Sequence, residues 1–457
     1  MSTRSTVTEL SGSGNNGLSV ARLIELDSVQ LVADRISRAP QRGVVPRGNG
    51  YAHGDAAQNG GGDVVALGGP LASPDRITIN VDSYTAQIPA GVTLDEVFRK
   101  LLYRGWFLPV SPDSRRMTIG GALATDSAGT NHVGRGTLAS HVNAMWVVDG
   151  RGELLSLRPN DETSDMFWAT IGGLGLTGVI TAIDISIIPV TSAWMNVNCQ
   201  RHDSLDDVLN ALATTPPRDS YSSAWIDTTA SGKSFGRGLV SSARHAPVTD
   251  LPSIRQPDAL ELGASGKVST NRFSVRNVIN NWTVRAFNEA RFRAASPQGV
   301  AELQPISDYL HSRDSSAHLS RTYGKRGSVH YQMCVPAASA DVIGRALGVL
   351  AEPGRQCLWA VVQRFGAGNP APLSFPVGGW ALDLEFPADL PELGRLLDDV
   401  DELVLHAGGR VNLAKDARIR PQLIDQFYPR ISHWQTVRHQ MDPHGRFASD
   451  MARRLSL

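Results

Sequence analysis

Two glycine-rich stretches constrain the fold of this chain more than any other feature of its sequence. The first reads QRGVVPRGNGYAHGDAAQN at residues 41–59, and the second reads MTIGGALATDSAGTNHVGRGTL at residues 117–138. Glycine lets a backbone approach a ligand closely, or take a positive φ, without a steric penalty. Because each stretch lies beside strand-like sequence, the pair predicts a cradle for a large phosphate-bearing cofactor. The alternative is two tight turns in an ordinary α/β protein.

Neither stretch matches a common nucleotide-binding template. Residues 47–50 begin like G-x-G-x-x-G, but His53 takes the place of the last glycine and Gly54 comes one residue late. The phosphate-loop pattern that ends in Gly-Lys-Ser/Thr is absent. A cradle made by these stretches therefore belongs to another class of binding site.

The chain is long enough for more than one domain. Its 457 residues exceed the size at which a single hydrophobic core stops growing, and its 41% hydrophobic content indicates a substantial core. Basic and acidic residues each number 44, so no excess of positive charge favours nucleic acid or an anionic membrane. We therefore expect no nucleic-acid partner.

Cysteine usage and the N-terminus bear on the compartment. Cys199, Cys334 and Cys357 lie far apart and form no CxxC pair, which predicts a reducing compartment and no metal site. No run of apolar residues has the length of a signal peptide or a membrane span. These features predict a cytoplasmic protein with no transmembrane segment. Residues 1–20, rich in Ser, Thr, Gly and Asn, are predicted to be flexible.

Residues 40–190 alternate between strand and helix signals. Residues 93–96 form a capping box that starts a helix, and Gly105 is its stop. Residues 144–148 and 153–157 flank Asp-Gly-Arg-Gly, which predicts a β-hairpin. Further strand-like runs lie at Val64–Leu67, Ile77–Val81, Thr85–Ile88 and Val179–Val190. The segment is therefore predicted to be an α+β domain that contains both glycine stretches.

Regular signals return in the last third of the chain. Residues 250–300 give no clear pattern and are either a mobile lid or an irregular structural insert. After them we predict strands at 328–335, 357–365, 379–386 and 410–414, and helices at 339–351 and 391–406.

Several segments together resemble a known family. The FAD-binding domain of the vanillyl-alcohol-oxidase (PCMH) type is similar to residues 47–59, 118–121, 167–173, 175–178 and 441–447. Within it, the flavoprotein subunits of decaprenylphosphoryl-ribose 2'-epimerase resemble residues 365–369, 371–376, 414–416 and 447–455. The resemblance covers residues 40–457 except a stretch around 235–325.

The resemblance implies an α+β, two-domain fold in which a central substrate (cap) domain is built on an antiparallel sheet. It divides the chain into a flexible N-terminus at 1–20, an FAD-binding domain at 21–192, a cap domain at 193–408 and a return to the FAD-binding domain at 409–457.

The resemblance also implies FAD as the cofactor, and Tyr51 bears on how it is held. Many relatives attach FAD covalently through a histidine, and here Tyr51 takes that place, which predicts non-covalent FAD. We name residues 47–59 the cofactor loop. His53 in this loop stands where the nearest relatives have tyrosine, and is either a backbone-loop contact of the cofactor or an exposed turn residue. The predicted cofactor-binding residues are Arg47, Gly48, Asn49, Gly50, Tyr51, His53, Gly54, Asp55, Asn59, Asp113, Ser114, Met117, Thr118, Gly120, Gly121, Ala124, Thr125, Ala128, Asn131, Gly136, Gly175, Val179 and Lys415.

The resemblance implies a catalytic end as well. Lys415 matches a lysine beside the pyrimidine edge of the flavin, where a cation stabilises the charge that reduction brings. Gln332 matches a residue of the family's substrate pocket, and we expect it to hydrogen-bond a sugar hydroxyl. Trp225 either stacks on the sugar or belongs to the core. The other predicted substrate-binding residues are Gln363, Glu385 and Asn412.

The predicted substrate pocket departs from the family pattern at several positions. Asp383 replaces a cysteine, His330 a glutamine, Gln363 a lysine and Ala128 a histidine. Strict alternation in residues 379–386 puts Asp383 and Glu385 on one face, which either lines the site or is solvated. A lost lysine and a gained carboxylate favour a neutral or cationic sugar, such as an amino sugar, over a phosphorylated one.

We expect an FAD-dependent enzyme that oxidises a sugar hydroxyl to a carbonyl by hydride transfer to flavin N5. Asp383, His330 and His132 are the candidate bases, and oxygen or another acceptor reoxidises the flavin. A separate NAD(P)-dependent reductase is a further expected partner. The alternatives are a decaprenylphosphoryl-ribose 2'-oxidase that acts with such a reductase, an aldonolactone or alditol oxidase, and a non-enzymatic flavin-binding subunit.

Overall fold

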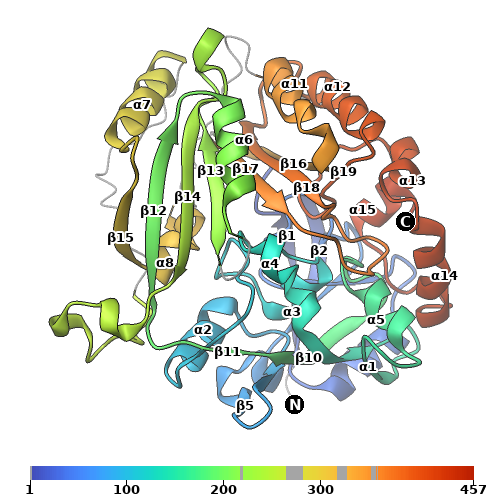
Figure 1. The fold of residues 1–457 in the computed structure, drawn as a ribbon. Coiled ribbons are helices and arrows are strands. Elements are labelled where there is room, and N and C mark those ends of the chain that lie inside the picture. The colour runs from blue at the N-terminus through green and yellow to red at the C-terminus, as the bar shows by residue number, and fades with distance from the viewer. Residues whose placement is uncertain (1–2, 217–219, 264–280, 316–326, 351–356, 358) are drawn as a thin grey trace.

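A computed structural model describes residues 3–216, 220–263, 281–315, 327–350, 357 and 359–457. The first part of the chain forms two sheets (Figure 1). One has the strand order β1–β2–β4–β3, and the other has the order β5–β6–β10–β8–β9. Their strands are β1 (Thr3–Ser11), β2 (Leu18–Leu26), β3 (Val44–Pro46), β4 (Asp63–Leu67), β5 (Thr78–Asn80), β6 (Thr85–Pro89), β8 (Val142–Val148), β9 (Leu154–Leu157) and β10 (Val179–Ser186).

Helices and short strands complete this part of the molecule. A short antiparallel pair joins β7 (Trp106–Phe107) to β11 (Ile188–Pro189). The helices are α1 (Val29–Ser37), α2 (Leu94–Leu102), α3 (Ile119–Ala124), α4 (His132–Arg135) and α5 (Ser164–Thr170).

The local signals in this region are confirmed. Thr93 Oγ1 accepts from the backbone N–H of Glu96 at 3.3 Å, and the Glu96 carboxylate accepts from the N–H of Thr93 at 2.9 Å, so the capping box starts α2 as predicted. Gly105 follows the helix with φ +76°, a conformation that glycine adopts without strain. Strands β8 and β9 pair as the predicted hairpin.

The expectation of a flexible lead-in at residues 1–20 does not hold for residues 3–11, which form a paired strand. β1 pairs with β2 in antiparallel register from Thr3–Leu26 to Ser11–Leu18, and β2 pairs in parallel with β4. This strand was not predicted because β1 is exposed to solvent over most of its length and has Thr and Ser instead of an apolar alternation. Backbone pairing, which the composition does not reveal, holds the segment in the sheet.

The middle of the chain forms the cap sheet, with the order β15–β12–β14–β13–β17–β18–β16–β19 and antiparallel pairings throughout that order. In Figure 1 it stands above the first two sheets, with α6 on one side and α11 and α12 at the upper right. Its strands are β12 (Trp194–His202), β13 (Tyr221–Ile226), β14 (Gly238–His245), β15 (Val300–Pro305), β16 (Ser328–Pro336), β17 (Trp359–Phe365), β18 (Gly379–Pro387) and β19 (Arg410–Val411).

Helices pack on this sheet and at its ends. They are α6 (Leu205–Thr214), α7 (Asn281–Ala294), α8 (Ile306–Tyr309), α9 (Ser312–Ser315), α11 (Asp341–Leu350) and α12 (Leu393–His406). The apolar side of α12 includes Leu396, Leu397, Val400 and Val404, each at most 3% exposed, which fixes the helix against the sheet.

The chain then returns to the first part of the molecule. Helices α13 (Ile424–Phe427), α14 (Ile431–Met441) and α15 (Asp450–Leu455) follow, and Val44 and Phe447 form a parallel bridge. The predicted α+β fold with an antiparallel cap sheet is thereby confirmed.

The detailed boundaries differ at some places. β10 ends at Ser186 instead of reaching residue 190, and β19 covers two residues of the predicted 410–414. The predicted boundary at 192/193 falls between β11 and β12, while β19 extends the cap sheet past the predicted boundary at 408, and this division stays a prediction. Part of the unassigned 250–300 segment, residues 264–280, lies outside the described residues, as do residues 351 and 358 of two predicted elements. No helix in the described ranges is long and apolar enough to cross a membrane.

Candidate active site

The two glycine stretches face each other across one cavity, which we name the glycine-rich cavity. Gly50 has φ +71°, and a Cβ there would overlap the guanidinium of Arg47. Gly175 has φ +74°, and its Cβ would lie 2.5 Å from Cγ of Pro46. Backbone therefore forms walls of the cavity where side chains do not fit. The predicted cofactor residues that line it are Arg47, Gly48, Asn49, Gly50, Tyr51, Met117, Thr118, Gly120, Gly121, Ala124, Thr125, Gly175 and Val179.

A second cavity, the polar cavity, continues from the first toward the cap sheet. It measures about 500 Å³, and Arg47, Asn49, Gly50 and Tyr51 line both spaces. The predicted residues on its wall also include His53, Asp113, Ser114, Met117, Thr125, Ala128, Gln332, Gln363, Glu385, Asn412 and Lys415. One space thus runs from backbone-lined walls to a wall of polar side chains, which suits a long cofactor with a substrate at its far end.

Several predicted cofactor residues lie outside both cavities and bind the protein itself. A Cβ on Gly54 would overlap the carbonyl oxygen of Asp416, so this glycine serves packing. Asp55 accepts two hydrogen bonds from Arg454, at 2.8 and 3.0 Å. Asn59, fully buried, donates to the carbonyl oxygens of Gly43 and Asp63. These residues stabilise the conformation of the cofactor loop through contacts within the protein.

Two further loop residues behave in the same way. The side-chain amide of Asn131 donates to the carbonyl oxygen of Pro109 at 2.9 Å, and Gly136 ends α4 with φ +69°. Neither lines the glycine-rich cavity or the polar cavity.

Trp225 and His132 also lie away from the cavities. Trp225, 6% exposed, packs with Leu239 and Phe292 and lies under the guanidinium of Arg291, which favours its core alternative. His132 is 1% exposed, and its Nδ1 lies 3.0 Å from the backbone N–H of Gly366. Burial lowers the pKa of His132 to about 4, and the ring has no access to the polar cavity as a base.

Lys415 reaches the polar cavity from a tight turn after β19. Asn412 Oδ1 accepts from the N–H of Ala414 at 2.9 Å, and the N–H of Lys415 donates to the carbonyl of Asn412 at 3.1 Å. The carbonyl of Ala414 accepts from the N–H of His53 at 2.9 Å, so this turn is joined to the cofactor loop. The lysine is therefore fixed relative to the loop that lines both cavities.

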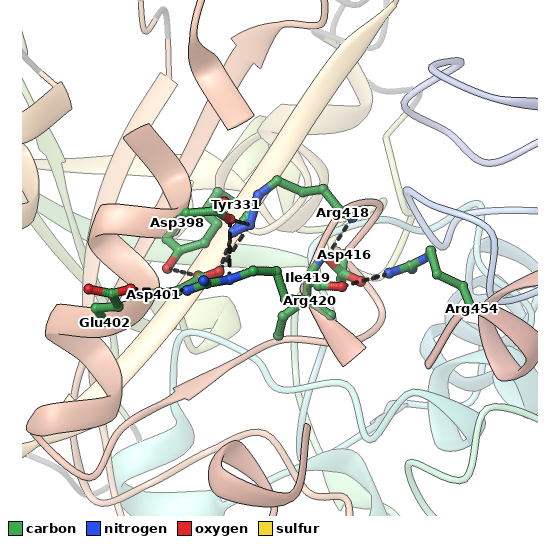
Figure 2. Close-up of polar contacts among 9 residues, drawn as sticks. All are labelled: Tyr331, Asp398, Asp401, Glu402, Asp416, Arg418, Ile419, Arg420 and Arg454. Atoms are coloured by element: carbon green, nitrogen blue, oxygen red, sulfur yellow. Dashed lines mark hydrogen bonds and ion pairs between the residues drawn. The ribbon is translucent and has the colours of Figure 1, made fainter. Parts of the chain in front are cut away.

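Ion pairs extend from this turn into the cap, as Figure 2 shows. Asp416 accepts from the backbone N–H groups of Arg418 and Ile419 and from Arg454 at 2.9 Å. Asp401, fully buried in α12, accepts from Arg418 Nη1 at 2.9 Å and from the Tyr331 hydroxyl at 2.8 Å. Burial raises the pKa of Asp401 to about 6, against the attraction of Arg418. The network joins the Lys415 turn to α12 and β16.

Asp383 does not line the polar cavity, contrary to prediction. The alternation placed it on the face of Glu385, and Glu385 does line the cavity, but Asp383 is 3% exposed. The side chains of His330 and Gln332 on β16 close over it: His330 Nε2 bonds Asp383 Oδ1, and Gln332 Nε2 donates to Asp383 Oδ2 at 3.3 Å. The neighbouring strand supplies the partners that a buried carboxylate needs.

His53 connects this buried group to the cofactor loop. Its Nε2 lies 2.8 Å from His330 Nδ1, and the two rings meet edge to face with centroids 4.2 Å apart. Three positions at which the sequence departs from the family pattern are thus bonded to one another. The alternative of an exposed turn residue is wrong for His53.

Part of the wall of the polar cavity was not predicted from the sequence. Ser11, Gly12 and Ser13, at the end of β1, line the polar cavity beside Arg116 and Asp314. Ser13 donates from its N–H to Ala52 at 2.9 Å and from its hydroxyl to Tyr51 at 3.1 Å. A signal existed in the Gly-Ser-Gly run at residues 12–14, which is as rich in small residues as the recognised stretches.

Comparison with known proteins agrees with this geometry. An FAD binding domain model matches residues 20–158, and a D-arabinono-1,4-lactone oxidase model matches residues 385–455. The chain is 33% identical to decaprenylphosphoryl-beta-D-ribose oxidase of Mycolicibacterium smegmatis, over 99% of this chain and 98% of that protein. It is 34% identical to an uncharacterized protein in the mprA 5' region of Streptomyces coelicolor, over 80% of this chain and all of that protein. Cytokinin dehydrogenase 4 of Oryza sativa is 28% identical over 39% of this chain and 35% of its own length.

The matched FAD domain model spans the first glycine stretch and the loop that leads into α3, whose start the Thr118 hydroxyl caps by accepting from the N–H of Gly121 at 3.2 Å. The backbone-lined cavity between them fits a bound dinucleotide. The near full-length relative extends the match through the cap sheet to the last helix. The chain is therefore an FAD-dependent oxidoreductase that belongs to the family of decaprenylphosphoryl-beta-D-ribose oxidase.

Proposed function

We propose that this enzyme oxidises a hydroxyl of a sugar-containing substrate to a carbonyl, and that the substrate is uncharged or cationic, an amino sugar (aminoglycoside-like) being the favoured class. FAD, held without a covalent bond, supplies the hydride acceptor at its N5 position. Oxygen or another acceptor would reoxidise the cofactor, and a separate NAD(P)-dependent reductase would act on the carbonyl product. The protein's contribution is binding, orientation and charge.

The charge balance of the polar cavity carries this proposal. Among the described residues on its wall, the carboxylates are Asp113, Asp126, Asp314 and Glu385, and the cations are Arg47, Arg116 and Lys415. Arg47 donates to the backbone oxygens of Ser11 and Ala57. Glu385 on β18 and the uncharged Gln363 on β17 leave this part of the cap sheet without a cation that would attract a phosphate.

Hydroxyl recognition is supported by the amides on the same wall. Gln332 and Asn412 both line the cavity, and Asn412 Nδ2 donates to Gln332 Oε1 at 2.6 Å. This bond fixes both amide orientations, which leaves defined donor and acceptor positions for a sugar. Lys415 lies on the same wall and supplies positive charge where reduction of the cofactor adds negative charge.

Two other activities remain as alternatives. The relative from M. smegmatis is named for decaprenylphosphoryl ribose, and near full-length similarity supports that substrate, oxidised at its 2' hydroxyl with a separate reductase. The match of residues 385–455 to a D-arabinono-1,4-lactone oxidase model supports a lactone or an alditol. The phosphate-bearing substrate is the weaker alternative because Glu385 and Gln363 offer it no cation. A lactone or an alditol is uncharged and fits this wall, but it offers Glu385 no counter-charge.

An anaerobic flavin-bleaching screen tests the proposal. Neutral, amine-bearing and phosphorylated sugars are added to the FAD-loaded enzyme, and loss of the yellow absorbance reports cofactor reduction. We expect bleaching by amine-bearing or neutral sugars and none by a decaprenylphosphoryl-ribose analogue. Bleaching by the phosphorylated analogue alone contradicts the proposal.

A pair of variants separates the roles of the two carboxylates. Glu385→Gln is expected to weaken binding of amine-bearing sugars about tenfold more than that of neutral sugars. Asp383→Cys, which changes the buried carboxylate, is expected to affect both classes alike.

Acid precipitation of the enzyme is expected to release all of the flavin into the supernatant, and flavin that stays in the pellet contradicts non-covalent binding.

A further inference from the structure

Six residues form a closed ring of hydrogen bonds between the cofactor loop and the cap sheet. From His53 the ring runs through His330, Asp383, Gln332, Asn412 and Ala414, whose carbonyl accepts from the N–H of His53 at 2.9 Å. It combines the cofactor loop, two neighbouring strands and the turn that carries Lys415. The ring contains one carboxylate and two imidazoles, three groups that can each gain or lose a proton.

The carboxylate sets the direction of the bonds around it. An ionised carboxylate only accepts, so with Asp383 ionised the Nε2 of His330 carries a hydrogen. When His330 is neutral, its Nδ1 then has a lone pair, and the hydrogen between the two rings belongs to His53 Nε2. When His330 is protonated, its charge balances that of Asp383. With Asp383 ionised, the charge state of His330 thus determines which nitrogen of His53 carries hydrogen: Nε2 when His330 is neutral, and Nδ1 when His330 is protonated.

We propose that Asp383 is a positioning residue of the cofactor loop, which acts through His330 and His53, and that these three side chains form one proton-sharing unit. Asp383 is buried, and its two partners on β16 separate it from the polar cavity. His53 does line that cavity, beside Tyr51 and Lys415. The unit therefore transmits the charge of Asp383 to the loop that holds the cofactor. It goes beyond the proposed function because it does not depend on the substrate.

Neighbouring charged groups define the surroundings of the unit. Glu385 lies opposite His330 in the β16–β18 register, and Cys357, whose pKa burial raises to about 12, is close to Asp383. The cofactor loop contributes Tyr51 and Asp55, and the turn after β19 contributes Lys415 and Asp416. Asp55 and Asp416 both bind Arg454. Glu385, on the same strand and two residues from Asp383, is the matched control for charge.

Proton NMR on the FAD-loaded enzyme tests whether the unit exists. We expect slowly exchanging imidazole N–H resonances at low field, assigned to His330 and His53 by ¹⁵N-histidine labelling. Asp383→Asn and His330→Phe should remove the His330 resonance, and Glu385→Gln should keep it. If the wild-type His330 N–H exchanges freely with water, the inference is overturned, even if no variant folds.

FAD affinity tests whether the unit acts on the cofactor. Asp383→Asn is expected to weaken FAD binding about tenfold or more, measured by flavin fluorescence on dilution, because a bond to a charged group is lost. In a His53→Ala background the same substitution should change the affinity little, because its effect passes through His53. Additive effects of the two substitutions overturn the inference.

A substrate readout separates this inference from the proposed function. If Asp383→Asn leaves FAD affinity and the His330 resonance unchanged but raises KM only for amine-bearing sugars, Asp383 acts on the substrate and the inference is wrong. Bleaching of the flavin by the phosphorylated analogue alone contradicts the proposed function and leaves this inference standing, because the resonance and FAD measurements use no substrate.

Discussion

The α-carbon of Gly54 packs so closely against the carbonyl oxygen of Asp416 that an added Cβ would overlap that oxygen. The contact joins the cofactor loop to the turn that begins with Asn412 and carries Lys415. It lies beside the hydrogen bond from the N–H of His53 to the carbonyl of Ala414. Two segments that are distant in sequence thus approach at the distance that only glycine permits.

Gly54→Ala should displace this loop. We expect a loss of about 1–3 kcal/mol of stability from overpacking, together with weaker FAD binding, measured by thermal melting and flavin titration. Gly348→Ala in α11, where an added Cβ meets nothing within 4 Å, is the control and should keep the wild-type stability and FAD affinity. Wild-type FAD affinity in the Gly54 variant contradicts the packing argument.

Gly12 supports the cofactor loop from the other side. Its Cβ would lie 2.5 Å from the carbonyl oxygens of both His53 and Gly54. Gly12→Ala should therefore reduce the flavin content of the purified enzyme, read from the ratio of flavin to protein absorbance. Gly17→Ala, in the same hairpin loop with nothing within 4 Å of the new Cβ, should not. Equal effects of the two substitutions would show that the hairpin tip does not support the loop.

Arg418 neutralises the buried carboxylate of Asp401. Arg418→Ala should cost about 3–5 kcal/mol, because removal of one partner leaves a buried charge, measured by denaturant unfolding. Arg420→Ala is the control, since its pair with Glu402 at 3.2 Å is exposed and should be worth less than about 1 kcal/mol.

The pKa of Asp401 gives the pH dependence of this effect. The pKa is raised from 3.8 to about 6 by burial, so the carboxyl's contribution to stability is fully present below its unfolded pKa and is lost as pH rises through about 6. The deficit of Arg418→Ala should therefore shrink as pH falls toward about 4, because a protonated Asp401 needs no counter-charge. A deficit that is constant with pH contradicts this account.

Lys415 is expected to act on the reaction more than on cofactor binding. Lys415→Met should slow flavin reduction about 10²- to 10³-fold, as for the loss of a group that stabilises developing charge, measured by anaerobic stopped flow. Lys100→Met, a change to an exposed lysine on α2, is the control and should leave the rate unchanged. If the Lys415 variant fails only to bind FAD, the lysine is a cofactor ligand and not an electrostatic catalyst.

Local chemistry made much of the fold predictable. The capping box at Thr93, the turn at residues 149–152 and the alternation in β18 depend on neighbours in sequence, and each is present in the structure. Strands β12 and β14 were not predicted because Asn, Ser and Arg interrupt their apolar pattern, and their pairing with each other supplies the stability that composition does not reveal.

The site was predictable where backbone lines it and less so where strands meet. Gly48, Gly50, Gly120 and Gly121 lie on the cavity wall as expected, because a close approach needs glycine whatever the surroundings. Gly54 and Gly136 were expected there too and lie outside both cavities. Alternation gave the face of Asp383 but not its burial, which depends on His330 and Gln332 from a neighbouring strand. The tie between His53 and His330 joins positions 277 residues apart, and no local pattern encodes it.

The contacts of the last helix, α15, with residues 55–60 imply an order in which these two segments come together. In α15, Asp450 accepts from the N–H of Gly60, Arg453 donates to Asn59, and Arg454 holds Asp55, 399 residues earlier in the chain. On a ribosome the cofactor loop emerges long before these partners exist. A nascent chain therefore cannot make these contacts to the loop until Asp450, Arg453 and Arg454 have been synthesised.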